Sequence, residues 1–264
     1  MKGKALFFDI DGTLVDYPHG IRSIPEGALE QMHRLRNEGN LLLIATGRPY
    51  AMMSEPVFSF PFDGFVSMMG GLVDIKGRTI SEVRFGFENA KELIRQLEDI
   101  GCQLLFETAR ECYARPESDE LLKFCGLFGF ADVVCTDFDM DDVAERLLKI
   151  EIAGAPEEMS RKIRETVSGR FGYEIVCSRE FGDSFDIFPP GISKAAGIEK
   201  AISYLNIRQE DTFAFGDSAN DIQMFRFCGT GIAMGNAVQE LKDCADITAE
   251  PVWDRGLEKI LKKL

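Results

Sequence analysis

The sequence predicts an α/β protein: a doubly wound, Rossmann-like parallel sheet with a second, α+β domain inserted into it. The first and last parts of the chain alternate short, wholly apolar strands such as LLLIA (41–45) with helical stretches. Strands without polar alternation are typical of a parallel sheet covered on both faces. The middle of the chain loses this order over enough residues for a domain. We therefore expect a core of residues 1–82 and 188–264 and an inserted domain of residues 83–187.

The first part of the chain is expected to form a strand, a helix and a second strand. ALFFDI (5–10) is a short apolar run that ends at Asp-Gly, which predicts a buried strand and a tight turn. Residues 25–38 place apolar side chains at helical spacing, and Gly39 is a stop signal. LLLIA is the second strand. Three short β-type stretches follow within residues 62–82, two of them joined by a hairpin turn at IKGR (75–78).

The remaining elements differ between the middle and the end of the chain. In the middle, helices are expected at 87–100, 117–129 and 157–170, and strands at 103–108, 111–115, 147–154, 173–178 and 184–188. At the end, helices are expected at 195–205, 220–227, 237–243 and 256–264, and strands at 212–216, 229–234 and 245–248. The regular alternation at the end restores the doubly wound pattern.

Composition excludes several classes of partner. The chain has 44 acidic and 30 basic residues, for a formal net charge of −14. Such a surface repels phosphate backbones, so we expect neither a nucleic acid nor a membrane as partner. No apolar run approaches a membrane helix, and the start of the chain lacks a signal peptide's features. The 7 cysteines include no C-x-x-C pair. We expect a cytoplasmic protein, either a monomer or a homodimer.

Two carboxylates follow the first predicted strand, in the motif DIDGT. Asp9 and Asp11 are spaced i and i+2, so on an extended chain they share one side. They also lie at the carboxyl end of a parallel strand, where such sheets bind ligands. Paired carboxylates indicate a hard metal ion, acid/base work or both. The alternative is an ordinary surface turn, in which Gly12 permits the sharp bend.

Two further signals are weaker when taken alone. Thr46, Gly47 and Arg48 (TGR) follow the LLLIA strand, and a hydroxyl and a glycine amide at a strand end can donate to an anionic oxygen. A loop without function is the alternative. Lys194 precedes a predicted helix after FPPGIS, and an isolated lysine is more often solvated.

The motif GDSAND repeats the pattern of acids at a strand end. Asp217 follows the strand TFAFG, and Asn220 and Asp221 begin the next helix. Two acids and an amide so close together suit Mg²⁺, which takes few carboxylates together with water and phosphate oxygens. Capping of the helix is the alternative, although a cap does not require Asp217 as well.

Together these four pieces resemble the haloacid dehalogenase (HAD) superfamily. DIDGT, TGR, Lys194 and GDSAND match its four motifs in order, and GIAMGNA, ADIT and DRGLEKIL look like its C-terminal region, so the similarity extends over the whole core. Only one helix and one strand fit between the first two motifs, whereas the long insertion lies between Arg48 and Lys194. This placement resembles the Cof-type phosphatases, whose type IIB α/β cap has that position. The resemblance implies a HAD core with an inserted α+β cap domain.

The resemblance also implies a Mg²⁺-dependent phosphatase that forms an aspartyl-phosphate. Asp9 would be the nucleophile, and Asp11 the general acid and then the general base. Lys194 would neutralise charge on Asp9 and the phosphoryl group. The implied catalytic residues are Asp9, Asp11, Thr46 and Lys194. The implied phosphate and substrate ligands are Gly12, Thr46, Gly47, Arg48, Lys194 and Asn220. The implied Mg²⁺ ligands are Asp9, the Asp11 backbone carbonyl, Asp217 and a supporting Asp221.

The substrate is expected to be a small phosphorylated metabolite. Sugar phosphates come first, followed by pyridoxal phosphate or a flavin nucleotide. The alternatives on the same fold are a phosphomutase, a phosphatase of sugar-phosphate conjugates and a non-enzymatic sugar-phosphate sensor. A sensor would have no need of Asp9 as a nucleophile, so its presence beside the other motif residues favours an enzyme.

Two regions bear on the substrate pocket. Met69 stands where related sequences usually carry an asparagine, so a polar contact from that position is lost. In the expected cap, Glu107, Arg110 and Arg115 lie on or beside a hairpin. They either face a cleft or form a solvated rim, and the rim is the expectation.

Overall fold

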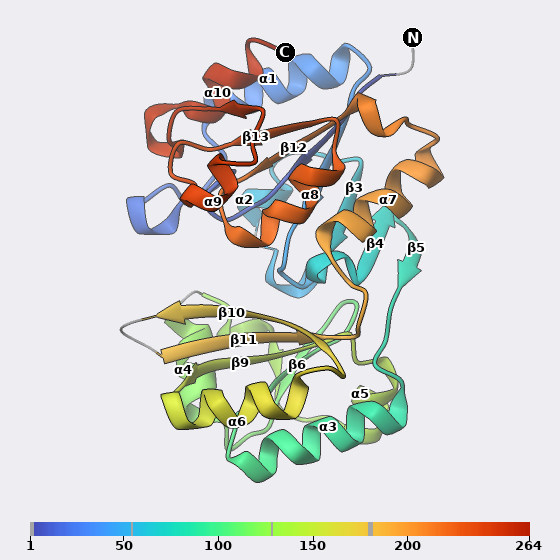
Figure 1. Ribbon diagram of the computed structural model, residues 1–264, viewed down its shortest axis with the longest axis vertical. Coiled ribbons are helices and arrows are strands. Elements are labelled where there is room, and N and C mark those ends of the chain that lie inside the picture. The colour runs from blue at the N-terminus through green and yellow to red at the C-terminus, as the bar shows by residue number, and fades with distance from the viewer. Residues whose placement is uncertain (1–2, 54, 128, 179–181) are drawn as a thin grey trace. The chain divides into compact units, whose positions relative to one another are not determined.

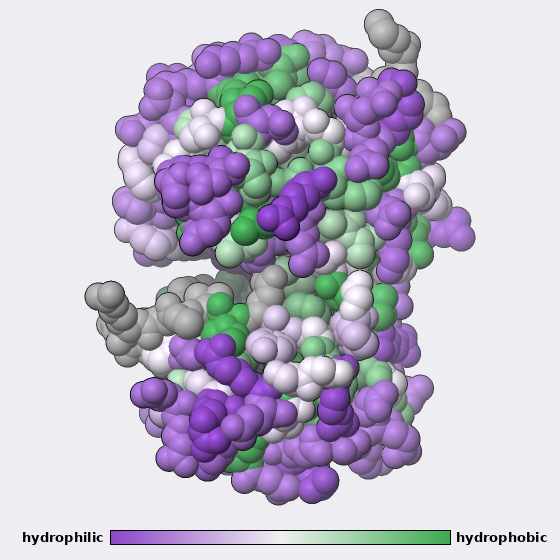
Figure 2. Space-filling view, in the orientation of Figure 1, coloured by the Kyte–Doolittle hydropathy of each residue, from purple (hydrophilic) through white to green (hydrophobic). Residues whose placement is uncertain are grey.

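The computed structural model describes residues 3–53, 55–127, 129–178 and 182–264 and forms two compact units (Figure 1). Unit 1 comprises Met1–Arg48, Met53–Ser81 and Ser193–Leu264. Unit 2 comprises Pro49–Met52 and Glu82–Ile192. Hydrophilic side chains cover most of the visible surface of each unit (Figure 2). Within the described part of the chain, no helix is both long and apolar enough to cross a membrane.

Unit 1 is built on one large sheet. Its strands are β1 Ala5–Phe8, β2 Leu41–Ala45, β3 Gly64–Ser67, β4 Leu72–Ile75, β5 Arg78–Glu82, β12 Thr212–Gly216, β13 Thr230–Ala233 and β14 Ile247–Thr248. Its helices are α1 Glu26–Asn37, α2 Glu55–Phe58, α7 Lys194–Leu205, α8 Ile222–Phe227, α9 Gln239–Lys242 and α10 Gly256–Leu261. The strand order is β14-β13-β12-β1-β2-β3-β4-β5, parallel from β14 to β3, with β4 antiparallel to β3.

Helices cover both faces of this sheet, as the apolar strands predict. Leu6 and Phe8 lie in a buried cluster with residues of α1 and α10. Ala5 and Phe7 lie in a second cluster with residues of α7 and α8. Because successive side chains of β1 enter opposite cores, every position on the strand is apolar. The predicted doubly wound sheet is confirmed.

The register of the central strands brings the candidate motifs to one edge. β1 lies between β2 and β12, and Phe8 is level with Ile44 on one side and Phe215 on the other. All three strands run parallel, so the segments that follow them leave the sheet together. These segments begin with Asp9, Thr46 and Asp217.

Unit 2 is an α+β unit with a mostly antiparallel sheet. Its strands are β6 Leu105–Glu107, β7 Cys112–Ala114, β8 Val134–Cys135, β9 Lys149–Ala155, β10 Gly172–Ser178 and β11 Gly182–Phe188, in the order β10-β11-β9-β6-β7-β8. Its helices are α3 Phe87–Ile100, α4 Asp119–Leu127, α5 Met140–Arg146 and α6 Glu157–Val167. Residues of α3, α5 and α6 form one core with Phe106, Ile150 and Phe185 of the sheet.

The helix α5 was not expected from the sequence. Its seven residues, MDDVAER, place only Val143 and Ala144 in the core, which is too short a pattern for helical periodicity. The signal that was present is a cap: the Asp139 side chain accepts hydrogen bonds from the backbone N–H groups of Asp141 and Asp142.

Candidate active site

A buried lysine organises the acidic side chains at the edge of the unit 1 sheet. Lys194 is the first residue of α7, and its ammonium donates to Asp9 at 2.8 Å and to Asp221 at 2.6 Å. The lysine side chain is fully buried and Asp9 is 5% exposed. The solvated alternative for Lys194 is therefore wrong. A lysine this deep requires carboxylate partners, and it has two.

Asp221 is held in place by backbone as well as by Lys194. Its Oδ2 accepts from the backbone N–H groups of Asp217 and Ser218, at 3.0 and 3.1 Å. Asp221 closes a short 3₁₀ helix and forms a capping box with Ser218. Both capping and charge pairing thus operate at this residue, so the two interpretations of GDSAND are compatible.

Asp217 lies close to Asp9 and Asp221, and one of its carboxylate oxygens makes no hydrogen bond. Its Oδ1 is buried and has no hydrogen-bond partner. Gly12 makes the approach possible: its φ is +70°, and a Cβ at that position would stand 2.0 Å from Asp217 Oδ2. Any side chain at residue 12 would collide with this carboxylate, so the glycine is required by space as well as by conformation.

Burial and repulsion between neighbouring carboxylates raise the pKa values of the acids in this cluster. Burial raises the pKa of Asp9 to about 7; Lys194 opposes this shift, and Asp221 and Asp11 add to it. Burial, with the charges of Asp9 and Asp221, raises the pKa of Asp217 to about 8. For Lys194, burial favours the neutral amine, but Asp221 and Asp9 outweigh it and raise its pKa. One lysine does not neutralise three carboxylates.

The geometry suits a metal ion. Asp9, Asp217 and Asp221 each offer an oxygen, and these oxygens lie within 4.8 Å of one another. The unpartnered oxygen of Asp217 and the excess negative charge fit a hard divalent cation with oxygen ligands. Asp9, Asp217 and Asp221 are three of the four residues that the resemblance implies as Mg²⁺ ligands, and this role stays a prediction. The fourth, Asp11, was implied through its backbone carbonyl.

Asp9 and Asp11 do not share one set of partners, contrary to the expectation from their spacing. β1 ends at Phe8, so the alternation of an extended strand does not continue to Asp11. The Asp11 carboxylate is 52% exposed and is bound by Arg48, whose Nε and Nη2 donate to its two oxygens at 2.8 and 2.6 Å. Its side chain therefore stands outside the three-carboxylate group.

Thr46, Gly47 and Arg48 form the turn after β2. Thr46 is buried, and its hydroxyl oxygen accepts from the backbone N–H of Arg48 at 3.2 Å. The hydrogen of that hydroxyl remains able to donate to a phosphoryl oxygen. Gly47 lies between them in a bend of the chain.

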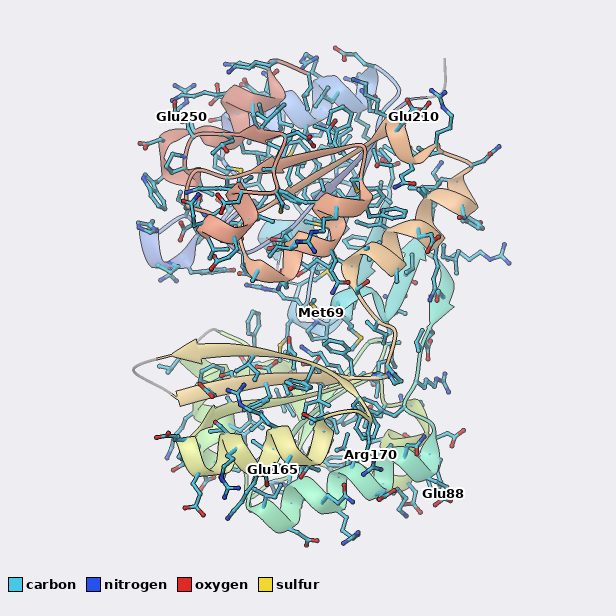
Figure 3. All side chains as sticks on the ribbon, viewed as in Figure 1. Met69, Glu88, Glu165, Arg170, Glu210 and Glu250 are labelled. Atoms are coloured by element: carbon cyan, nitrogen blue, oxygen red, sulfur yellow. The ribbon has the colours of Figure 1, made fainter. Side chains whose placement is uncertain are left out.

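The turn is supported by an unusual neighbour, the Met68–Gly70 3₁₀ helix. Met68 and Met69 both have positive φ angles, 51° and 58°, a backbone conformation that residues other than glycine rarely adopt. Their N–H groups donate to the carbonyls of Arg48 and Thr46, at 3.2 and 3.1 Å. Met69 (Figure 3) is buried, so the position of the usual asparagine is filled by an apolar side chain.

Two asparagines, Asn220 and Asn236, lie in the segments around these acids. The sequence predicts Asn220 as a site residue but not Asn236. Asn220 accepts from the Ser218 hydroxyl at 2.9 Å, in the segment that holds Asp217 and Asp221. Asn236 belongs to the sequence GIAMGNA, in which no pattern marks it as a site residue. Its Nδ2 donates to the Gly12 carbonyl at 2.8 Å, and its Oδ1 accepts from Val252 N–H at 3.1 Å. It therefore supports the turn that follows Asp9.

Glu107, Arg110 and Arg115 of the predicted cap each have a partner within unit 2. Glu107 is fully buried, so its expected place on a solvated rim is wrong. Its Oε1 lies 3.1 Å from Nζ of Lys149, itself 2% exposed. Arg115 pairs with Glu98 at 2.6 Å, and Arg110 lies over the Tyr50 ring at 4.4 Å.

This combination of fold and site defines an α/β enzyme whose carboxylates stand at the ends of parallel strands. A family model for haloacid dehalogenase-like hydrolases matches residues 6–261. The putative phosphatase YkrA of Bacillus subtilis (strain 168) is 30% identical over 269 residues, covering 100% of this chain and 98% of that protein. The 5-amino-6-(5-phospho-D-ribitylamino)uracil phosphatase YitU of the same strain is 26% identical over 273 residues, covering 99% and 97%.

A solved structure agrees with these relatives. The HAD subclass IIB sugar phosphatase BT4131 has a TM-score of 0.81 and 26% identity, covering 98% of each chain. The chain belongs to the haloacid dehalogenase-like hydrolase family. Within that family it is a HAD-type phosphatase, and the resemblance found in the sequence is confirmed.

Proposed function

We propose that this protein is a Mg²⁺-dependent phosphatase that hydrolyses small phosphomonoesters through an aspartyl-phosphate at Asp9. The observation that carries the proposal is the buried Asp9 carboxylate, which accepts a hydrogen bond from Lys194 and lies within 4.8 Å of a carboxylate oxygen of Asp217. A carboxylate held this way is oriented for attack, and the charge around it favours a cation and a phosphoryl group.

The reaction proceeds in two displacements. The Asp9 carboxylate forms a bond to phosphorus as the bond to the leaving-group oxygen breaks, and Asp11 gives that oxygen its proton. Asp11 then takes a proton from a water molecule that attacks the aspartyl-phosphate. Inorganic phosphate leaves and the Asp9 carboxylate is restored.

The other site residues bind and neutralise charge. Lys194 offsets the charge of Asp9 and of the phosphoryl group. The Thr46 hydroxyl and the Gly47 amide hold phosphoryl oxygens. The remaining proposed phosphate and substrate ligands are Gly12 and Asn220. Arg48, which the resemblance also implies as a ligand, donates to the Asp11 carboxylate instead. Mg²⁺ held by Asp9, Asp217, a supporting Asp221 and the Asp11 carbonyl would supply positive charge at the phosphoryl group.

The proposed substrates are sugar phosphates, with pyridoxal phosphate and flavin nucleotides as further candidates. The similarity to a sugar phosphatase and to a phosphatase of a ribityl-bearing uracil supports a polar, hydroxyl-rich leaving group. We assign the choice of leaving group to unit 2, the segment inserted between the second and third motifs. We also propose a cytoplasmic monomer or homodimer, with no nucleic acid and no membrane as partner.

The test measures phosphate release from a panel of phosphorylated metabolites, with Mg²⁺ or with EDTA. We expect Mg²⁺-dependent release from the wild type and none from D9N. D11N is expected to accumulate phosphorylated protein, because the second displacement needs Asp11 as a base. Full activity of D9N, or of the wild type in EDTA, contradicts the mechanism. Transfer of phosphate to another hydroxyl indicates a mutase, and silence across the panel favours a sensor.

A further inference from the structure

The contact between Arg48 and Asp11 is the closest two-point ion pair at the site. Two guanidinium nitrogens reach the two carboxylate oxygens, at 2.8 and 2.6 Å. Asp11 is half exposed, whereas the Arg48 side chain is only 14% exposed. An exposed carboxylate alone samples several rotamers, but a forked pair with a packed arginine fixes its plane and position.

Both the backbone and the side chain of Arg48 are held by neighbouring residues. Its N–H donates to the Thr46 hydroxyl, and its carbonyl accepts from Met68 N–H at 3.2 Å. Its guanidinium carbon lies 5.6 Å from the centre of the Tyr17 ring, and the Tyr17 side chain adds a hydrogen bond. The Tyr17 segment is a 3₁₀ turn capped by Asp16. The arginine therefore joins the second motif to the segment that follows the first.

We propose that Arg48 is a positioning residue that sets where the Asp11 carboxylate stands for proton transfer, and that it acts through Asp11 rather than on the phosphate. The inference rests on the proposed function, which gives Asp11 its proton-transfer role. A proton donor misplaced by about 1 Å loses much of its effect, so the fork contributes to rate more than to substrate binding. A lysine keeps the charge but makes only a one-point contact, because it has no planar fork.

The test compares two leaving groups in R48K. Nitrophenolate leaves without a proton, whereas the alkoxide of a hexose monophosphate needs one. We expect kcat/KM to fall by about 30-fold for the hexose monophosphate and by less than about 3-fold for p-nitrophenyl phosphate. kcat should fall for both substrates wherever the second displacement limits turnover, because Asp11 activates water for both. KM is expected to change little.

A double-mutant cycle tests whether Arg48 acts through Asp11. In a D11N background, R48K should change kcat/KM for the hexose monophosphate by less than about 2-fold, because the group it positions is gone. Y17F should give a smaller loss of the same selective kind. The matched control is R208K, which alters a similar fork on Asp211 with contacts of 2.8 and 3.2 Å. It should leave both substrates unaffected.

The outcomes separate this inference from the proposed function. Equal losses of kcat/KM for both substrates, a KM rise for both, or additive effects of R48K and D11N contradict positioning and indicate contact with the phosphate. If R48K lowers the thermal midpoint more than R208K, the leaving-group comparison still decides, because partial unfolding lowers both rates equally. A wild type without Mg²⁺-dependent hydrolysis would instead overturn the proposed function.

Discussion

Among the residues that the structure describes, each unit has one buried lysine surrounded by three carboxylates, and the two clusters differ in the contacts that the lysine makes. In unit 1, Lys194 bonds Asp9 and Asp221, while Asp217 keeps an unpartnered oxygen. In unit 2, Lys149 contacts all of its acids. These are Glu107 at 3.1 Å, Glu151 at 3.6 Å and Asp186 at 2.9 Å. Both oxygens of Glu107 likewise have no hydrogen-bond partner. The two clusters therefore differ in how their oxygens converge, and not in whether an oxygen is unpartnered.

The backbone explains this difference. The acids of unit 1 lie in turns beyond strand ends, and N–H groups of the turn hold Asp221. The acids of unit 2 project from strands β6, β9 and β11, whose N–H groups are used in the sheet. In the described chain, only the acids of unit 1 bring three oxygens together as a metal site requires. Buried charge alone does not make a site; convergence of free oxygens does.

The largest contrast is expected in activity. K194M removes the cation that holds Asp9, so kcat for p-nitrophenyl phosphate should fall by about 10³-fold or more. K149M removes the equivalent lysine of unit 2 and should keep at least about a third of wild-type kcat at a temperature where it is folded. Steady-state kinetics on both variants measures this. Comparable losses of kcat in the two variants would contradict a catalytic role for Lys194 and a structural role for Lys149.

For stability, we expect the lysine of unit 2 to be important, so K149M should be clearly destabilised. K149M leaves three acids without a cation in a site where Glu107 is fully buried. We expect unit 2 to lose about 3 kcal/mol of unfolding free energy, measured by urea titration with a probe in that unit. The matched control is K162M, which alters an exposed pair with Glu158, and it should cost less than about 1 kcal/mol. An unchanged K149M transition would mean that Lys149 does not hold these acids.

The effect of Mg²⁺ on the stability of unit 1 is expected to depend on pH. In the folded protein without metal, the pKa values of Asp9 and Asp217 are raised from 3.8 to about 7 and about 8. Stability is therefore lost as pH rises through these values, because folding then confines ionised carboxylates. Saturating Mg²⁺ should restore about 2 kcal/mol near pH 8.5 and less near pH 6.

Thermal midpoints with and without Mg²⁺ test this expectation at both pH values. D217N should lose most of the Mg²⁺ effect, whereas D186N in unit 2 should retain it. A Mg²⁺ effect that is the same in D217N and the wild type would place the metal elsewhere.

The sequence was sufficient to bring the motif residues of unit 1 to one edge of the sheet, because the carboxyl ends of neighbouring parallel strands lie side by side. Apolar strands followed by DIDGT, TGR and GDSAND place Asp9, Thr46 and Asp217 at one edge, and the structure has that arrangement. What sequence could not supply was the partner of each side chain. The strand ends at Phe8 rather than beyond it, so Asp11 turns to Arg48.

The unit 2 cluster could not be found in the same way. Its members come from three strands paired in an order that local pattern does not encode, and no motif marks them. Charged residues on short strands predict exposure, so Glu107 was expected on a rim. Only the pairing of β6 with β9, which sets Glu107 level with Lys149, reveals the burial.

The smallest expected effect concerns the protonation of Glu107. Burial raises the pKa of this carboxyl well above its ordinary value, and Glu151 and Asp186 add to the shift that Lys149 opposes. The stability that the neutral carboxyl contributes is present below the ordinary value of 4.5 and is lost as pH rises through the folded value. E107Q keeps the shape of the neutral carboxyl and cannot ionise. The unfolding free energy of E107Q should therefore rise relative to that of the wild type by at least about 1.4 kcal/mol between about pH 4 and about pH 8, because each unit of pKa shift is worth about that much.

The control for this measurement is E98Q, which changes the half-buried carboxylate paired with Arg115 in the same unit. It should follow the wild type within about 0.5 kcal/mol across the same range. If E107Q also follows the wild type, Glu107 is ionised in the fold and Lys149 neutralises it outright. In that case the carboxylates of both clusters are ionised around a charged lysine, and the clusters differ only in geometry. A gain by E107Q alone means that unit 2 balances its excess acid with a proton, where unit 1 leaves room for a metal ion.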